Sequence, residues 1–184
     1  MAYFDKEHIN RIEYFEELFA RLDDLEALAL NEYEIQDLAQ DNNLKLLQTL
    51  ILFDMENQSD REGSDSYDRY GRPWELKTCN ANLVTGFSTN HHTNLERIAI
   101  FRNENWLFSI YRGIKLIEVY ALSSEMLEPF FDKWETQVRA KMAMGTENPH
   151  LNNPKIPIKY VVQNGIRVYP FSNPPVDPAE LFHE

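Results

Sequence analysis

Two carboxylates and a lysine near residue 70 have the types and spacing of a metal-dependent phosphodiesterase centre. Glu75 and Lys77 stand two positions apart in residues 74–79, an expected β-strand, so their side chains share one face. Asp65 lies just upstream, beyond a turn-rich stretch, and a chain that folds back would place it beside Glu75. Adjacent carboxylates repel unless a proton or cation separates them, and hard oxygen ligands suit Mg²⁺. The pattern predicts a Mg²⁺ site at which Lys77 holds or deprotonates the attacking water.

The same three residues also fit a structural role, as an ion pair on an exposed edge strand. Asp, Glu and Lys are common side chains, and their spacing alone does not separate the two interpretations. The single cysteine, Cys79, falls on the same face of the expected strand. It is expected to be a small buried side chain rather than a catalytic thiol.

Two further polar groups have the chemistry to read base edges in DNA. His91 and His92 lie in a polar loop, and a neutral imidazole offers one donor and one acceptor to the major groove. Asn152 and Asn153 carry amides, which pair a donor and an acceptor with adenine. Alternatively, the histidines are solvated or bind a metal by chance, and Asn-Asn-Pro forms a turn before a strand. Neighbouring side chains that could reach bases or phosphates are Ser88, Thr89, Lys155 and Lys159.

Hydrophobic periodicity predicts the elements that must hold these groups. Helical spacing of apolar residues covers 9–28 and 35–51, with a polar break at 40–43. After the strand at 74–79 and a polar loop to residue 94, strands are expected at 106–112 and 115–122, joined as a hairpin at Gly113. Ser123 is the expected N-cap of a helix over 125–142. A second hairpin, with strands 156–162 and 166–169, is expected around Asn164-Gly165.

These elements predict the fold class α+β, or mixed α/β, in a single domain spanning residues 1–184. Residues 1–53 form a helical region that is a candidate dimerisation interface, and packing on the chain's own core is the equal alternative. Residues 54–170 hold the catalytic and DNA-recognition groups. The Pro-rich tail, 171–184, is expected to make few core contacts.

Charge is distributed very unevenly along the chain. The net charge is −12, and residues 1–68 carry 18 acidic against 5 basic side chains, while residues 69–184 carry 12 against 13. A DNA-facing surface would therefore come mainly from residues 69–184, and a cleft lined with carboxylates would need cations to receive DNA. The sequence has no run long enough to span a membrane, its N-terminus lacks the pattern of a secretion signal, and it has one cysteine. The expected location is a reducing cytoplasm, with no membrane association.

Several blocks of residues, in constant order and at nearly constant spacing, resemble the PvuII family of restriction endonucleases. The blocks are Gln40-Asp41-Asn42, Arg61-Glu62-Gly63 with Asp65, Glu75-Leu76-Lys77, Gly86-Phe87-Ser88-Thr89 with His91-His92, Ile110-Tyr111-Arg112-Gly113, Asp132-Lys133-Trp134-Glu135 and Asn152-Asn153-Pro154-Lys155-Ile156-Pro157. The resemblance is weak before Glu34 and does not reach the end of the chain.

This resemblance implies a restriction-endonuclease-like core, a mixed β-sheet flanked by helices, and a type II enzyme that is homodimeric and Mg²⁺-dependent. It implies cleavage of both strands of a palindromic site in duplex DNA, and a cognate DNA methyltransferase in the same host. On this mapping Asp65, Glu75 and the backbone carbonyl of Leu76 bind the metal. Lys77 assists the water nucleophile, and Glu62 is an acidic neighbour that supports the centre.

The same mapping implies which residues read DNA. His91 and His92 would contact the central bases from opposite subunits, and Asn153 would read an adenine with Asn152 alongside. Because these residues and Ser88 are retained, the target predicted is the six-base palindrome CAGCTG, cut bluntly at its centre.

Other positions depart from the family or are harder to place. Phe101 stands where the family carries a tyrosine beside the metal centre, so lower activity or a changed metal preference is expected. Ser64 before Asp65 departs from the Pro-Asp common in the wider superfamily. Asp41 matches an acidic residue at the minor-groove side of the family's DNA complex. Two alternatives stay open: a structure-specific or non-specific nuclease of the same superfamily, and a catalytically weakened DNA-binding protein.

Overall fold

The computed structural model describes residues 6–39, 41–58 and 64–182. They fall into two compact units, Met1–Leu47 and Gln48–Glu184. The second unit contains the strands of the described chain and every candidate site residue except Asp41, which lies in the first unit, and Glu62, which lies outside the described residues.

The first unit consists of α1 (Lys6–Tyr33) and the start of α2 (Asn43–Phe53). The long helix predicted from apolar spacing is therefore confirmed. It ends where Glu34 takes a left-handed φ of 56° and its amide donates to the carbonyl of Leu30. Asp41, in the polar break before α2, also has a left-handed φ, of 51°. Among the described residues, no helix has the length and apolar character needed to cross a membrane.

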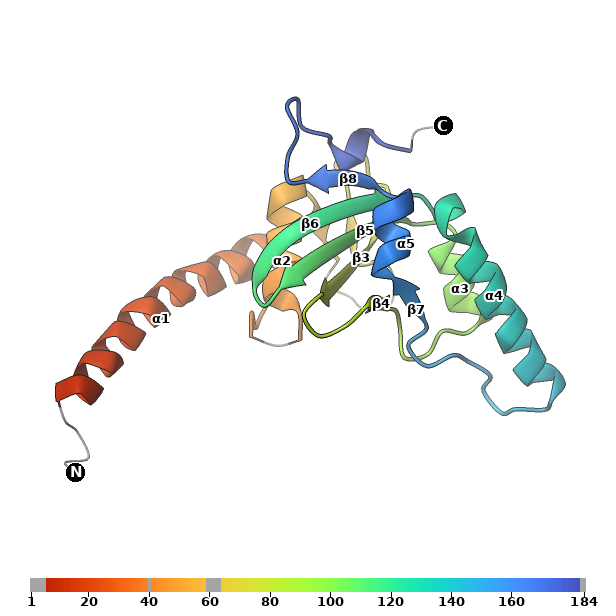
Figure 1. Cartoon of the computed structure of the whole chain (residues 1–184), viewed down its shortest axis with the longest axis horizontal. Coiled ribbons are helices and arrows are strands. Elements are labelled where there is room, and N and C mark those ends of the chain that lie inside the picture. The colour runs from red at the N-terminus through yellow and green to blue at the C-terminus, as the bar shows by residue number, and fades with distance from the viewer. Residues whose placement is uncertain (1–5, 40, 59–63, 183–184) are drawn as a thin grey trace. The chain divides into compact units, whose positions relative to one another are not determined.

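The second unit is a mixed sheet with helices packed around it (Figure 1). The sheet order is β1-β2-β3-β5-β6-β8, in which β3 and β5 are parallel and the other neighbours antiparallel; β4 and β7 form a separate antiparallel pair. The strands are β1 (Glu56–Asn57), β2 (Ser66–Tyr67), β3 (Pro73–Asn80), β4 (Gly86–Ser88), β5 (Asn105–Arg112), β6 (Lys115–Leu122), β7 (Lys155–Pro157) and β8 (Ile166–Tyr169), and the helices are α3 (Leu95–Phe101), α4 (Ser124–Ala143), α5 (Ile158–Asn164) and the short 3₁₀ helix η1 (Pro178–Glu180).

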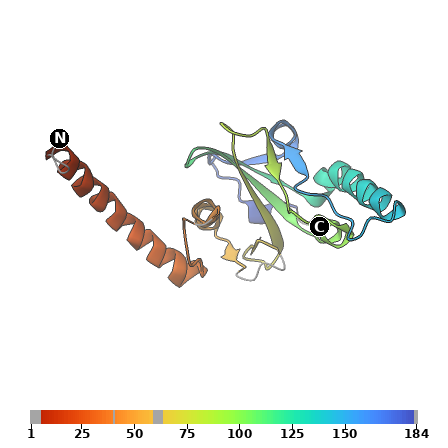
Figure 2. The same cartoon turned by 90° about the horizontal axis from the view of Figure 1, so that it is seen from below.

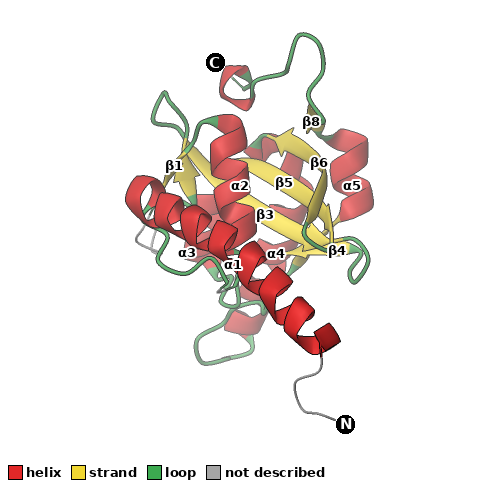
Figure 3. Cartoon of the chain, turned by 90° about the vertical axis from the view of Figure 1, so that its left-hand side faces the viewer, coloured by secondary structure: helices red, strands yellow, loops and turns green. Residues whose placement is uncertain are grey.

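β5 is buried on both faces, because every side chain from Trp106 to Tyr111 is buried. One face of the sheet carries the main core, in which Phe108 and Trp106 pack against apolar side chains of α3, α4 and α5. Figure 2 shows α3 and α4 lying together beside the sheet. On the opposite face, α2 from Gln48 onward contacts β5, with Thr49 Oγ1 3.4 Å from Ser109 Oγ (Figure 3).

Most of the elements expected from local signals are present. The strand at 74–79, the hairpin of β5 and β6 and the helix at 125–142 are confirmed, and so is the α+β fold class. Ser123 occupies the N-cap position of α4 with extended backbone, although its side chain makes no capping hydrogen bond.

The hairpin predicted around Asn164-Gly165 is wrong. Residues Ile158–Asn164 form α5, and β8 follows it. Gly165 has a φ of −82°, so it does not serve a left-handed turn. It is required for close packing instead, because a Cβ there would lie 2.6 Å from Leu122 Cδ1 and 2.8 Å from the carbonyl oxygen of Val161.

Several short elements were not predicted, among them β1, β2, η1 and two that lie near the candidate site, β4 and α3. The expected loop at 80–94 contains β4, and α3 follows it. α3 is capped by Asn94, whose side-chain oxygen accepts from the amide of Arg97 at 2.8 Å. Asn94 was assigned to the end of the loop, and a seven-residue helix gives too short a periodic pattern to stand out in the sequence.

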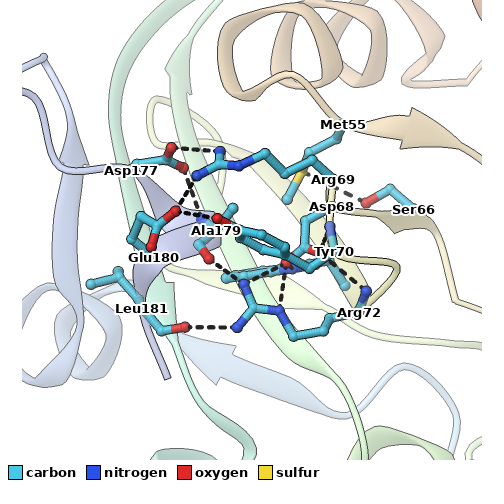
Figure 4. Close-up of polar contacts among 11 residues, drawn as sticks. Met55, Ser66, Asp68, Arg69, Tyr70, Arg72, Asp177, Ala179, Glu180 and Leu181 are labelled. Carbon is cyan, nitrogen blue, oxygen red and sulfur yellow. Dashed lines mark hydrogen bonds and ion pairs between the residues drawn. The ribbon is translucent and has the colours of Figure 1, made fainter. Parts of the chain in front are cut away.

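The expectation that the tail makes few core contacts is wrong for residues 177–182, whereas residues 171–175 are exposed as expected. Pro178 and Ala179 are buried, and Arg69 forms ion pairs with Asp177 and Glu180. Figure 4 shows these contacts between η1 and the turn that precedes β3. Arginines in this turn pair with carboxylates and carbonyls of the tail. The composition of the tail alone did not reveal these contacts.

Candidate active site and nucleic-acid interface

The chain before β3 folds back and places Asp65 beside the strand. Asp65 immediately precedes β2, which pairs antiparallel with β3. The amide of Leu76 donates to Asp65 Oδ2 at 2.9 Å. Lys77 Nζ lies 3.4 Å from the same oxygen and also forms an ion pair with Glu75 Oε1. One ammonium group therefore links the two carboxylates that the sequence placed in a metal site.

Arg97 of α3 is a second cation at this centre, and the sequence analysis did not identify it. Its guanidinium lies 3.0 Å from Glu75 Oε2, so both oxygens of the fully buried Glu75 face a cationic side chain. The guanidinium also stacks over the ring of Phe101, 4.7 Å from its centroid. Phe101 is buried and carries no hydroxyl, so its part here is to support Arg97.

Burial and charge together set the protonation of the cluster. The pKa of Glu75 is raised to about 7, chiefly because burial disfavours the carboxylate. Lys77 and Arg97 oppose that shift, while Asp65 and Glu104 add to it. For Lys77, burial lowers the pKa, but Glu75 and Asp65 outweigh burial and the net pKa lies above its ordinary value. Lys77 is thus an ammonium donor at neutral pH rather than a free amine.

Glu104 is a third acid at the centre that sequence analysis missed. It directly precedes β5 and is 2% exposed. Burial raises its pKa, Asp65 adds to the rise, and Ser64, Arg97 and Lys77 oppose it. Neither carboxylate oxygen accepts a hydrogen bond of ordinary geometry from the described residues, even though the Ser64 hydroxyl is close enough to affect the pKa. The signal in the sequence that could have identified Glu104 is an acidic residue immediately before a strongly apolar strand.

The donor set of Asp65 and Glu75 fits Mg²⁺, which favours one or two carboxylates and retains several waters. The Lys77 ammonium between them marks the region where a cation would neutralise both. Glu75 Oε1 is buried against the Lys77 ammonium, with which it forms an ion pair. In the described part of the chain, however, no three His, Cys, Asp or Glu side chains already form a metal-binding group. The fit is therefore to a two-carboxylate site completed by other oxygens.

The roles expected for two further members of the centre, Leu76 and Glu62, stay predictions. The amide of Leu76 contacts Asp65, whereas the metal-binding role given to its carbonyl stays a prediction. Glu62 lies outside the described residues.

The structure brings together the two groups expected to read bases, although some 60 residues separate them. β4 pairs with β7, with Ser88 opposite Lys155. Beyond this pair, the amide and hydroxyl of Thr89 both donate to the carbonyl of Pro154, at 3.2 and 2.8 Å. An isolated bridge between Thr93 and Leu151 closes the other end of the two loops.

His91 and the two asparagines lie in contact within these loops. His91 Nδ1 is 3.2 Å from Asn152 Oδ1 and 3.1 Å from Asn153 Nδ2. His91, His92 and Asn152 are exposed, and His92 packs against His150 with ring centroids 4.4 Å apart. Asn153 has a left-handed φ of 48°. The arrangement presents imidazole and amide groups from two loops on one exposed patch.

The other candidates differ in how they are placed. Ser88 and Lys155 are exposed and adjacent across the β4–β7 pair, whereas Thr89 is buried with its hydroxyl engaged by Pro154. Thr89 therefore holds the two loops together. Asp41 is exposed in the first unit, and its expected role at the minor groove stays a prediction.

A comparison with models of known protein families shows which family this chain resembles over most of its length. A family model described as Restriction endonuclease PvuII matches residues 10–169. The match covers β3 with Asp65, Glu75 and Lys77, the β4–β7 loops and the whole sheet, so the two sites described above both lie within it. The mixed sheet with flanking helices agrees with a restriction-endonuclease-like fold.

Proposed function

We propose that this chain, which belongs to the PvuII family of restriction endonucleases, is a Mg²⁺-dependent homodimer that cuts CAGCTG bluntly at its centre. Membership of the family makes it a type II site-specific deoxyribonuclease that acts on duplex DNA. The observation that carries the proposal is the Lys77 ammonium held between the carboxylates of Asp65 and Glu75.

We infer distinct roles for the residues of the catalytic centre. Asp65 and Glu75 would bind Mg²⁺, with the carbonyl of Leu76 alongside, and Glu62 would support them. When bound, the metal would stabilise charge that develops on phosphate oxygens. Because the pKa of Lys77 is raised, its ammonium would donate a hydrogen bond to the attacking water or to a phosphate oxygen. Arg97 would keep one oxygen of Glu75 fixed.

Recognition is assigned to the exposed patch of the two loops. His91 and His92 would contact central bases, and Asn153 would pair with an adenine while Asn152 fixes the His91 ring. Ser88 and Lys155 would reach a base edge or phosphate from the adjacent strand pair. The close contact of His91 with both asparagines supports a single reading surface for the half-site.

The proposed dimer would use the N-terminal helical region. α1 keeps the apolar side chains Tyr14, Leu22 and Leu30 exposed, which a partner subunit would cover. A cognate methyltransferase in the same host would protect its DNA, and a single cysteine, Cys79, is consistent with a reducing cytoplasm.

A plasmid of known sequence with one CAGCTG site tests the proposal. Incubation with Mg²⁺ should give a single linear product whose blunt ends ligate without filling, and EDTA should abolish cutting. A matched plasmid with one base of the site changed should stay intact. Smearing of both plasmids would indicate a non-specific nuclease, and binding without cutting would indicate a catalytically weakened protein.

A further inference from the structure

We propose that Glu104 is a positioning residue of the cation site, whose buried carboxylate offsets Arg97 and gives the Asp65–Glu75 pair the net negative charge that a divalent cation requires. This inference rests on the proposed Mg²⁺-dependent function and adds a residue that lies outside the motif spacing.

The topology places Glu104 on the face of the sheet that holds the centre. β5 runs parallel to β3, with Trp106 opposite Glu75 and Phe108 opposite Lys77. Glu104 lies two residues before Trp106, and side chains two positions apart in an extended chain point to the same face. Because Trp106 is opposite Glu75, Glu104 lies on the face from which Glu75 projects. Accordingly, charges on Asp65, Lys77 and Arg97 act on its carboxyl group.

Glu104 contributes negative charge to a cluster whose other four charges cancel. Asp65 and Glu75 are matched by Lys77 and Arg97, which contact them directly. A divalent cation would meet a neutral cluster if these four groups were alone. Among the residues that the structure describes, an ionised Glu104 turns the balance negative, so it attracts the cation without contacting Asp65 or Glu75.

The energetics of burial support a functional reason for keeping this acid. Glu104 is 2% exposed, and with the Ser64 hydroxyl nearby neither of its oxygens accepts a hydrogen bond of ordinary geometry from the described residues. A buried carboxyl group with incomplete hydrogen bonding is costly, and a site that receives a ligand or charge gives a reason to keep one.

Binding of Mn²⁺, followed as free Mn²⁺ by electron paramagnetic resonance without DNA, tests the role directly. Glu104→Gln should weaken Mn²⁺ binding about tenfold, the effect of removing one charge from a partly buried site. Arg97→Met, which keeps apolar contact with Phe101, should tighten binding instead. The double variant restores the original charge balance and should bind Mn²⁺ close to the wild-type value. Glu125→Gln, an exposed acid on α4, is the matched control and should change nothing.

Glu104→Gln and Arg97→Met are expected to change Mn²⁺ affinity in opposite directions. This difference separates an electrostatic role from simple disruption of the site, which would weaken binding in both. Equal affinity of Glu104→Gln and wild type, or weaker binding in all three variants, would overturn the inference. If Glu104→Gln does not fold, judged by thermal unfolding, Arg97→Met and the double variant decide the matter. If Asp65→Asn loses Mn²⁺ binding while Glu104→Gln binds normally, the role of Glu104 is wrong but the proposed metal site stands. Unchanged binding in Asp65→Asn removes the proposed metal site itself.

Discussion

Lys77 is the side chain on which the chemistry depends most directly, because its ammonium contacts both carboxylates. Lys77→Met keeps the length and packing of the side chain and removes the donor. We expect single-turnover cleavage to fall roughly 10²–10³-fold, the usual effect of removing one preorganised hydrogen-bond donor. DNA binding in Ca²⁺, measured by gel shift, should change little. The exposed Lys115→Met is the control, and normal cleavage by Lys77→Met would remove Lys77 from the mechanism.

Asn153 allows base reading to be tested without straining the backbone. Its φ of 48° favours glycine over alanine, so Asn153→Gly removes the amide while the loop keeps its conformation. We expect preference for CAGCTG over a site changed at the adenine to fall by about 1–3 kcal/mol, the value of one good base contact. Competition binding with the two duplexes measures it. An unchanged preference would show that the patch around His91 is not the reading surface.

At the scale of elements, the sequence predicted the helices and strands that are marked by patterns in their own residues. β3, the β5–β6 hairpin and α4 follow from periodicity, a turn glycine and a capping position. β4 and β7 were missed or misassigned because each is three residues long and depends on pairing with a partner distant in sequence. Asp65, Glu75 and Lys77 could be grouped from spacing, whereas Glu104 could not, because its significance lies in burial with incomplete hydrogen bonding.

Gly165 shows how a tertiary contact overrides a local turn signal. Gly165→Ala would place a methyl group 2.6 Å from Leu122 Cδ1 and 2.8 Å from a backbone carbonyl. We expect a loss of roughly 1–3 kcal/mol in the free energy of unfolding, because the backbone carbonyl cannot move aside easily. Urea denaturation measures the change. The neighbouring Asn164→Ala, exposed at the end of α5, should cost less, and a neutral Gly165→Ala would argue against close packing.

At the scale of the whole second unit, the tail and the turn before β3 are joined by one buried carboxylate. Asp68 is 2% exposed and accepts from Trp74 Nε1 at 3.0 Å and from the amide of Tyr70 at 2.9 Å. It also pairs with Arg72, whose guanidinium donates to the carbonyls of Ala179 and Leu181. The turn that leads from Asp65 into β3 therefore depends on contacts made by the C-terminal segment (Figure 4).

This network predicts a stability that depends on pH. Burial raises the pKa of Asp68, but hydrogen bonds from Trp74, Tyr70 and Arg72 outweigh it, and the net pKa lies below the ordinary 3.8. Because the folded-state pKa is depressed, the stabilisation is present above about pH 4 and is lost as pH falls through the folded value. Asp68→Asn leaves Arg72 without its buried counter-charge and should cost roughly 3–5 kcal/mol at pH 7. Urea denaturation from pH 7 to pH 3 should show the difference from wild type shrinking in acid. A difference that stays constant over this range would mean that the charge of Asp68 does not hold the tail.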